Sequence, residues 1–287
     1  MTNAPKVILI TGCSSGFGML AASRFASQGH YVIATMRNLN KQGMLADELK
    51  RRQAQTEIYQ MDVLDRESIQ YVIREIGAKH GSIDVLINNA GIIIGGAFED
   101  LSDDEIRLVM ETNFFGVQNV TRAVIPLMRQ KRSGRIINIS SISGFYGSPG
   151  LGAYNASKWA LEGFSESLYY ELKPFGINVI LIEPGAYKTK IFGENANLAR
   201  NFLNEESPYY KMSAFLKNRI DESLKDNYRE PEEVVKVIER AMNDTFPKLR
   251  YTTEIEGKVL RFLKVFLPFR LFSFIYQRLL FKGFKSR

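Results

Sequence analysis

The chain has 287 residues, of which 45% are hydrophobic and 24% are charged, a balance that is typical of a folded globular protein and argues against extensive disorder. Its single cysteine, Cys13, excludes an internal disulfide, and the first apolar run is too short for a signal peptide, so we expect a cytoplasmic protein. The net charge is +7, but residues 258–287 carry +8 and no acid, which leaves −1 for the rest of the chain. Charge confined to one end argues against a nucleic-acid partner.

Short runs of β-forming apolar residues alternate with stretches of helical periodicity along most of the chain. The short runs predict strands over residues 6–10, 31–35, 57–61, 84–87, 134–139 and 178–182. The helical patterns cover residues 17–26, 41–53, 66–80, 103–130, 154–173 and 232–243. This alternation predicts an α/β protein with a doubly wound parallel sheet, the Rossmann fold, in one catalytic domain over residues 1–257.

The stretch after Gly185 is polar and irregular to about Asp226, and residues 190–227 within it are expected to form a lid over a substrate. Apolar and aromatic side chains recur there, which suits a lipophilic ketone or alcohol. Ordinary core beneath a surface flap explains them equally well. These side chains are Phe192, Phe202, Leu203, Tyr209, Tyr210, Met212, Phe215 and Leu216.

Residues 258–287 are predicted to form a basic, amphipathic C-terminal helical extension that Pro268 interrupts. Leucines and cations lie on separate helical faces in its first half. The leucines are Leu260, Leu263 and Leu267, and the cations are Lys258, Arg261 and Lys264. No apolar run approaches the length of a membrane span. Two interpretations stay open: peripheral contact with an anionic membrane, or packing against the body or another subunit.

A glycine-rich turn, residues 11–18 (TGCSSGFG), follows the first predicted strand. Glycine permits positive φ and lets a pyrophosphate approach the backbone, and the start of the next helix attracts phosphate. The G-x-x-x-G-x-G spacing is moderately specific, and a turn without ligand is the alternative. The residues expected to contact a dinucleotide here are Gly12, Ser14, Ser15, Gly16, Phe17 and Gly18.

The end of the second predicted strand points to the choice of cofactor. Residues 34–37 include no acid that could accept a hydrogen bond from a ribose 2′-hydroxyl. Arg37 can instead pair with a 2′-phosphate. The sequence therefore favours NADP(H) over NAD(H), unless Arg37 is only a solvated loop residue.

Tyr154 and Lys158 are four residues apart, so on a helix they share a face. A nearby ammonium favours a phenolate, so we expect Lys158 to lower the pKa of Tyr154. Tyr154 then serves as general acid in ketone reduction and general base in alcohol oxidation. Ser141, after the fifth predicted strand, is expected to donate a hydrogen bond to the substrate oxygen.

Tyr169 and Lys173 repeat the spacing of Tyr154 and Lys158, but Ala156 stands where a matching serine would be. We therefore expect this second pair to lie on its helix without a catalytic role. It shows that the Tyr-x-x-x-Lys pattern is weak evidence unless it is accompanied by the serine and the glycine turn.

Taken together, these motifs resemble a classical short-chain dehydrogenase/reductase over residues 6–189. The resemblance extends to Asn-Asn-Ala-Gly at residues 88–91, to Asp62 with Val63, to Asn113 and to Pro-Gly-x-x-x-Thr at residues 184–189. The glycine turn and residues 34–37 are similar to those of the branch that includes 17β-hydroxysteroid and retinol dehydrogenases. The resemblance also implies a homodimer or homotetramer.

The resemblance implies a role for each matching residue. Lys158 would bind the nicotinamide ribose as well as tune Tyr154, and Asn113 would hold a water in a proton relay. The other residues implied to contact the cofactor are Asp62, Val63, Asn89, Ala90, Gly91, Pro184, Gly185 and Thr189. Plainer interpretations stay open: Asn113 as a structural bond-former, Asp62 as a strand-end cap, and Asn89 as a tie between strands.

The leading hypothesis is an NADP(H)-dependent oxidoreductase that interconverts a lipophilic ketone or aldehyde and its alcohol. A catalytically weak NADP(H) sensor or lipid-surface protein on the same scaffold is the alternative. An epimerase or dehydratase of the extended branch fits less well, because its glycine spacing differs and no sugar-nucleotide domain is evident. The residues expected to carry catalysis are Asn113, Ser141, Tyr154 and Lys158. No metal site is expected, because His30 and His80 lie far apart in sequence.

Overall fold

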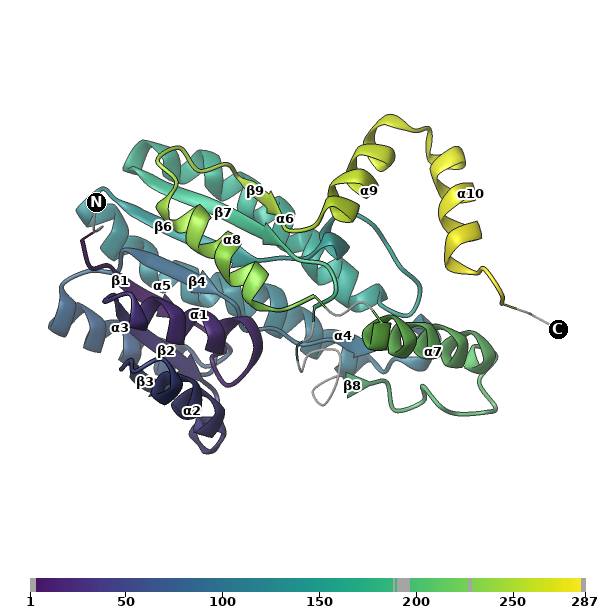
Figure 1. Ribbon diagram of the computed structural model, residues 1–287, viewed down its shortest axis with the longest axis horizontal. Helices are drawn as coiled ribbons and strands as arrows, with labels where there is room; N and C mark the ends of the chain where they lie inside the picture. The colour runs from purple at the N-terminus through teal and green to yellow at the C-terminus, as the bar shows by residue number, and fades with distance from the viewer. Residues whose placement is uncertain (1–3, 188, 190–196, 227–228, 285–287) are drawn as a thin grey trace.

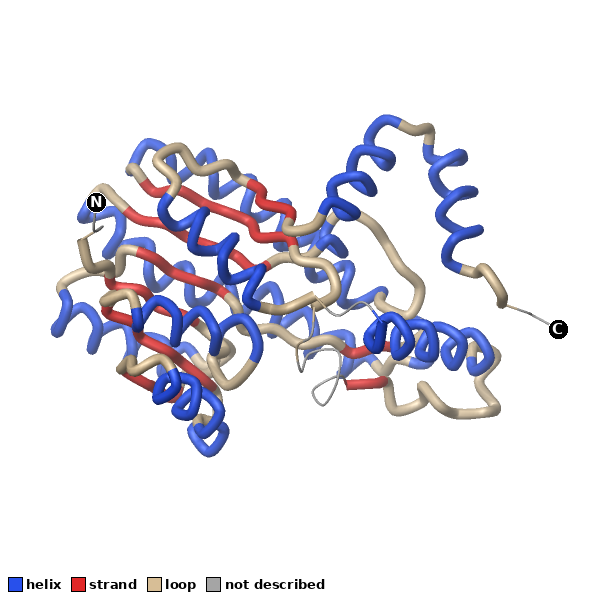
Figure 2. Tube along the Cα trace, viewed as in Figure 1, coloured by secondary structure: helices blue, strands red, loops and turns tan. Residues whose placement is uncertain are grey.

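The computed structural model describes residues 4–187, 189, 197–226 and 229–284. Its centre is a parallel sheet of seven strands in the order β3-β2-β1-β4-β6-β7-β9 (Figure 2). The strands are β1 (Val7–Ile10), β2 (Tyr31–Met36), β3 (Glu57–Gln60), β4 (Val85–Asn88), β6 (Gly134–Ile139), β7 (Ile177–Glu183) and β9 (Arg250–Thr252). The strand order reverses between β1 and β4, which is where sheets of this kind bind ligands.

Helices cover both faces of the sheet (Figure 1). One face carries α1 (Gly16–Ser27), α2 (Gly43–Arg51) and α8 (Glu232–Asn243). The other carries α3 (Arg66–His80), α5 (Gly116–Lys131) and α6 (Gly152–Leu172). Short 3₁₀ helices lie at Leu39–Lys41, Phe98–Asp100, Ile142–Gly144 and Lys173–Phe175. The doubly wound fold predicted from the alternating pattern is confirmed.

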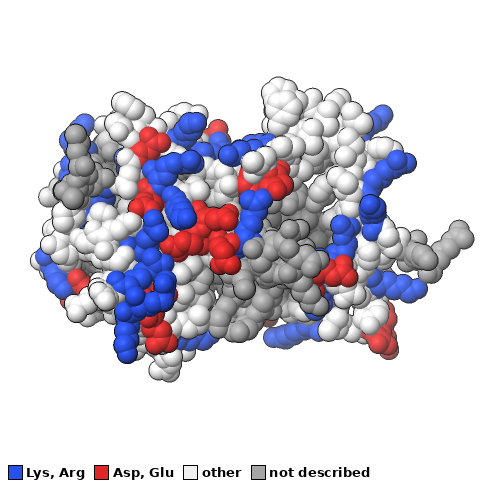
Figure 3. Space-filling view, in the orientation of Figure 1, with Lys and Arg blue, Asp and Glu red and all other residues white. Residues whose placement is uncertain are grey.

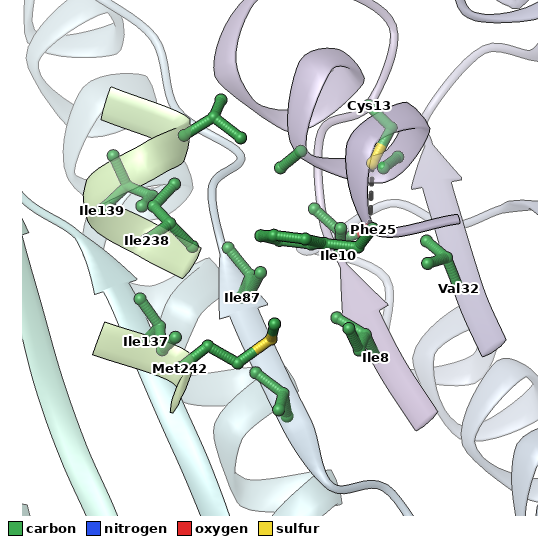
Figure 4. Close-up of a cluster of buried hydrophobic side chains, with 14 of the residues drawn as sticks. Ile8, Ile10, Cys13, Phe25, Val32, Ile87, Ile137, Ile139, Ile238 and Met242 are labelled. Atoms are coloured by element: carbon green, nitrogen blue, oxygen red, sulfur yellow. Dashed lines mark hydrogen bonds between the residues drawn. The ribbon is translucent and has the colours of Figure 1, made fainter. Parts of the chain in front are cut away.

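Side chains of the central strands alternate between two buried layers, because successive residues of a strand point to opposite faces. Ile8 and Ile10 pack with Phe25 of α1 and Met242 of α8. Figure 4 shows this layer, with Phe25 and Met242 on either side of Ile87. The intervening positions of β1 face the layer beneath α3 and α5. Because these strands are buried on both faces, their sequences are unbroken runs of apolar residues.

The predicted helix over residues 103–130 is helical throughout, but part of it is not α-helical. It consists of α4 (Asp103–Met110), a π-helical turn at Glu111–Phe115, and α5. The side chain of Asn113, inside that turn, bonds both backbone groups of Ile92 and the hydroxyl of Ser157. These bonds hold the widened turn in place, and turns of this kind often occur at functional sites.

The segment after β7 also differs from the prediction of irregular structure to Asp226. Tyr210–Asp226 form a helix, α7, and Asn197–Leu198 form a short strand, β8, that pairs with β5 (Ile94–Gly95). Phe192, named above as part of a lid, lies outside the described residues. The predictions also omitted β9, a short strand that pairs with β7 at the edge of the sheet.

The C-terminal extension consists of α9 (Ile255–Phe266) and α10 (Phe269–Leu280), separated at Pro268 as predicted. The two helices form a bent pair at one end of the molecule, and α10 comes back towards α7 (Figures 1 and 2). None of the helices formed by the described residues combines the length and hydropathy that crossing a bilayer requires.

Candidate active site

A cavity of ≈ 430 Å³ opens at the carboxyl ends of the strands, beside the reversal in strand order. It brings together every residue that the sequence marked for cofactor binding or catalysis, except Gly18 and Asn113. The marked residues that line it are Gly12, Ser14, Ser15, Gly16, Phe17, Arg37, Asp62, Val63, Asn89, Ala90, Gly91, Ser141, Tyr154, Lys158, Pro184, Gly185 and Thr189.

The glycine turn between β1 and α1 has the geometry of a phosphate cradle. Gly12 and Gly16 have φ of 72° and 59°, a region that favours glycine. A Cβ atom on Gly12 would lie 2.8 Å from the Cα of Ala90, and one on Gly18 would lie 2.4 Å from the Nδ2 of Asn89. The side chain of Ser15 makes no capping bond to α1, and the first turn of α1 has no acid. The positive end of this helix is therefore open to an anion.

Asn89 joins the glycine turn to the end of β4. Its side-chain amide donates to the carbonyls of Thr11 (2.9 Å) and Gly12 (3.0 Å). The Thr11 hydroxyl accepts from the backbone N–H groups of Asn89 (3.0 Å) and Ala90 (2.9 Å). Asn89 thus ties adjacent strands, as its plainer interpretation holds, and does so at the cavity wall.

Two cations lie at the end of the cavity nearest β2. Arg37 is exposed, and Lys41, which the sequence analysis did not single out, lines the same wall. Among the described lining residues, Asp62 is the only acid. Its Oδ1 accepts from the backbone N–H of Leu64 at 3.0 Å, so Asp62 also caps the turn after β3. The only signal in the sequence for Lys41 is that a second cation follows Arg37 shortly after the end of β2.

Tyr154 and Lys158 lie near the start of α6, and both are buried. The Nζ of Lys158 is 5.7 Å from the centre of the Tyr154 ring and donates to the carbonyl of Ile139 at 2.8 Å. The Ser141 hydroxyl accepts from the backbone N–H of Ser143 (3.1 Å) and donates to the carbonyl of Pro184 (3.3 Å). Three of the four predicted catalytic residues, Ser141, Tyr154 and Lys158, therefore line one cavity.

The pKa values in this site differ from the expectation for Tyr154. Burial raises the pKa of Tyr154 to about 12, although a hydrogen bond with the Ser141 hydroxyl opposes this rise. Burial lowers the pKa of Lys158 to about 8, and Glu162 opposes the fall. The predicted net fall in the pKa of Tyr154 was wrong, because desolvation of the phenolate outweighs its stabilisation by the Lys158 ammonium. Tyr154 is thus held as a neutral phenol, the form that donates a proton.

Asn113 is fully buried and does not line the cavity, although its neighbour Thr112 does. Its Oδ1 accepts from the N–H of Ile92 at 2.8 Å, and its Nδ2 donates to the carbonyl of Ile92 (2.9 Å) and to the Ser157 hydroxyl (3.0 Å). Both ends of the amide are therefore engaged in structural bonds. This geometry fits the plainer interpretation of Asn113 as a bond-former.

The sequence model of the family described as short chain dehydrogenase matches residues 6–198. The chain belongs to this family. It is an oxidoreductase that acts on CH–OH groups with NAD(P).

Individual relatives agree with this assignment. A 3-ketodihydrosphingosine reductase of Bacteroides thetaiotaomicron is 43% identical over 69% of this chain and 74% of its own length. Retinol dehydrogenase 8 of Homo sapiens is 37% identical over 92% of this chain and 86% of its own. The crystal structure of a short-chain dehydrogenase from Streptomyces avermitilis matches with a TM-score of 0.78 at 33% identity, covering 98% of this chain and 97% of that one. The family predicted from the motifs is confirmed.

In this short-chain dehydrogenase, the second Tyr-x-x-x-Lys pair lies apart from the cavity. Lys173 has its Nζ 5.8 Å from the centre of the Tyr169 ring, almost the same separation as in the first pair. Neither residue is among the described residues that line the cavity. The pair therefore offers a matched internal control for mutations of Tyr154 and Lys158.

Two acids near the site were missed by the sequence analysis. The Oε1 of Glu254 accepts from the backbone N–H of Gly185 at 2.8 Å, and so holds the loop after β7. Glu183 is fully buried at the end of β7 and accepts from the Thr252 hydroxyl at 2.6 Å. Burial raises the pKa of both carboxyls. No local motif surrounds either acid, because their partners lie some 70 residues away in sequence.

Proposed function

We propose that this short-chain dehydrogenase uses NADP(H) to interconvert a lipophilic ketone or aldehyde and the corresponding alcohol. The observation that carries the proposal is the meeting of Ser141, Tyr154 and Lys158 in the cavity that also contains the glycine turn. A sensor without catalysis would not require a buried, protonated phenol beside a hydroxyl at this place.

The cavity fits a dinucleotide, since the glycine turn lines it and the start of α1 is uncapped and has no acid in its first turn. The turn and the start of α1 would hold the pyrophosphate. Asp62 and Val63 would contact the adenine side, and the loop from Pro184 to Thr189, held by Glu254, would contact the nicotinamide amide. The bound cofactor supplies or accepts the hydride.

The chain's own residues handle the substrate oxygen and the proton. Ser141 would donate a hydrogen bond to the substrate oxygen as negative charge develops on it. Tyr154 would give its phenolic proton to that oxygen in reduction and take one back in oxidation. The Lys158 ammonium, 5.7 Å from the ring, would stabilise the phenolate that forms when the proton leaves.

A lipophilic substrate is supported by the walls near Tyr154. The Tyr154 ring belongs to a buried apolar cluster that includes Phe202 from the segment before α7, and Ile93 and Val109 from the body. The presence of Phe202, one of residues 190–227, in the same buried cluster as Tyr154 supports a lid on this side of the cavity. The names of the two relatives above refer to a keto-sphingoid base and to retinol, both long apolar molecules.

A substrate panel tests the proposal. Purified protein is given NADPH or NADH with a keto-sphingoid base, a retinoid aldehyde and a steroid ketone, and the loss of reduced cofactor is followed. We expect turnover with at least one lipophilic carbonyl and a preference for NADPH. Tight NADPH binding without turnover on any carbonyl or alcohol would instead favour the sensor.

Replacing Arg37 with methionine is expected to lower kcat/KM with NADPH by about 10- to 100-fold, the equivalent of one lost charge-assisted contact. Activity with NADH should change little, because no 2′-phosphate is present. Lys41→Met should act in the same direction. Arg66→Met, which removes an exposed cation outside the cavity lining, is the matched control. Equal losses with both cofactors would remove Arg37 from 2′-phosphate recognition.

We further propose that residues 1–257 form the catalytic domain, with a lid at residues 190–227. Residues 258–287 would then form an extension that contacts a membrane surface. A cytoplasmic site of action is part of the same proposal. A homodimer or homotetramer is expected from the family resemblance. Light scattering of the purified protein measures the subunit number directly.

A further inference from the structure

The first helix of the extension turns two of its three cations, Arg261 and Lys264, towards the body of the molecule. The guanidinium of Arg261 pairs with the carboxylate of Glu183 and lies 4.3 Å from the centre of the Phe145 ring. The ammonium of Lys264 donates to the carbonyl of Phe145 and lies 4.2 Å from the centre of the Trp159 ring. A solvated amphipathic helix on a protein surface would have the opposite orientation, with its charges outward.

The opposite side of the extension is apolar and exposed. Ten large apolar side chains have between 39% and 76% of their surface accessible. They are Ile255, Val259, Phe262, Val265, Phe266, Phe269, Leu271, Phe274, Ile275 and Leu279, which we call the C-terminal apolar face. Figure 3 shows largely uncharged surface where α9 lies. Soluble monomers rarely expose so many large apolar side chains within one short segment, so a partner is indicated.

The remaining cations of the extension show which kind of partner fits. Lys258, Arg270, Arg278 and Lys282 are exposed, and no acid occurs after Glu256. Figure 3 shows Lys and Arg atoms along the edge formed by α10. A second copy of the chain would bring the same cations against one another across a symmetric contact. An anionic surface would instead complement them.

The extension is held in a defined position. Phe272 of α10 is buried and stacks on Tyr276, whose ring also contacts Tyr146 in the loop before α6. Arg219 of α7 donates to the carbonyls of Leu279 (3.0 Å) and Leu280 (2.5 Å) at the end of α10. These contacts hold the apolar face in place before binding, so ordering of the chain adds little to the entropic cost of association.

We propose that the C-terminal apolar face inserts into the interfacial region of an anionic lipid bilayer, with α9 and α10 lying along its surface. Each helix has 12 residues, which is too short to span a bilayer. Apolar side chains would enter the acyl boundary while the exposed cations meet anionic headgroups. Because α10 contacts both α7 and the loop before α6, the inserted face adjoins the elements around the proposed substrate site.

Vesicle flotation tests this proposal without reference to turnover. The full-length protein is mixed with vesicles of phosphatidylcholine alone, or of phosphatidylcholine with phosphatidylserine, and the floating fraction is measured. One variant combines Phe262→Ser, Val265→Ser and Phe266→Ser. Its matched control is Phe246→Ser, which changes a phenylalanine that is 85% exposed outside the extension. A second variant combines Arg270→Gln with Arg278→Gln. Thermal unfolding and NADPH binding verify that each variant is folded.

We expect the parent protein to float with the anionic vesicles, and the triple variant to lose at least about tenfold in partition. The control should float like the parent. The paired arginine variant should lose about fivefold per cation on anionic vesicles only. The proposal fails if the parent does not float, or if the triple variant floats as well as the parent. A self-associated species that the triple variant dissolves, without flotation, would show that a second copy covers the face.

Discussion

Replacing Tyr154 with phenylalanine is expected to lower turnover by about 10²- to 10⁴-fold, the range of a lost general acid. The substitution removes only the hydroxyl, while the ring keeps its place in the cluster with Phe202 and Val109. The Ser141 hydroxyl keeps its bond from Ser143, so the fold should survive. Steady-state oxidation of NADPH with the best carbonyl of the panel gives the rate, and thermal unfolding verifies the fold.

Tyr169→Phe is the matched control for this prediction, since it removes the same atom from the same helix, beside Lys173, away from the cavity. It should retain the turnover of the parent. If Tyr154→Phe turned over at a rate close to that of the control, Tyr154 would not be the proton donor. NADPH binding should be similar in both variants, which separates a loss of chemistry from a loss of cofactor.

The parts of the site that could be predicted from the sequence are those in which spacing alone determines geometry. Tyr154 and Lys158 share a face because any helix places residues four apart on one side. The glycine turn, the end of β4 and Ser141 meet because the carboxyl ends of parallel strands lie at one edge of the sheet. These inferences needed only the element types, and the element types followed from apolar periodicity.

The parts that could not be predicted depend on contacts between distant segments. The pKa of Tyr154 rises because segments around Ile93, Val109 and Phe202 bury the phenol, and no local pattern reports how much water they exclude. Arg261 of α9 turns inward because it pairs with Glu183, which lies 78 residues earlier. An amphipathic pattern gives two faces, but it does not show which of them the body will cover.

Short or unusual elements were missed for a related reason. The strand β9 has three residues, too few for a period of two to be seen, and its pairing with β7 makes it a strand. The π-helical turn around Asn113 leaves the apolar pattern of residues 103–130 intact, so the sequence predicts one helix. A π-helical turn contains one residue more than an α-helical turn. In this turn Asn113 donates hydrogen bonds to Ile92 and Ser157, which are distant in sequence.

Lys158→Met is expected to lower kcat by about 10²- to 10³-fold, comparable to removing one preorganised charge at a developing anion. The phenolate formed as Tyr154 gives up its proton is costly in this buried site, since burial raises the pKa of Tyr154 to about 12. The Lys158 ammonium is the cation positioned to offset that cost, 5.7 Å from the ring. Lys173→Met, in the second pair, should leave kcat unchanged.

The pH profile separates this electrostatic role of Lys158 from a purely structural one. Because burial lowers the pKa of Lys158 to about 8, its charge is present below that pH and is lost above it, whereas Tyr154 stays protonated throughout. Reduction at saturating NADPH should therefore slow as the pH rises through about 8, and Lys158→Met should lack this step. The lowered pKa also predicts that folding becomes more favourable above about pH 8, since the unfolded chain keeps its proton there. A step near pH 8 that persists in Lys158→Met would assign the titration to another group.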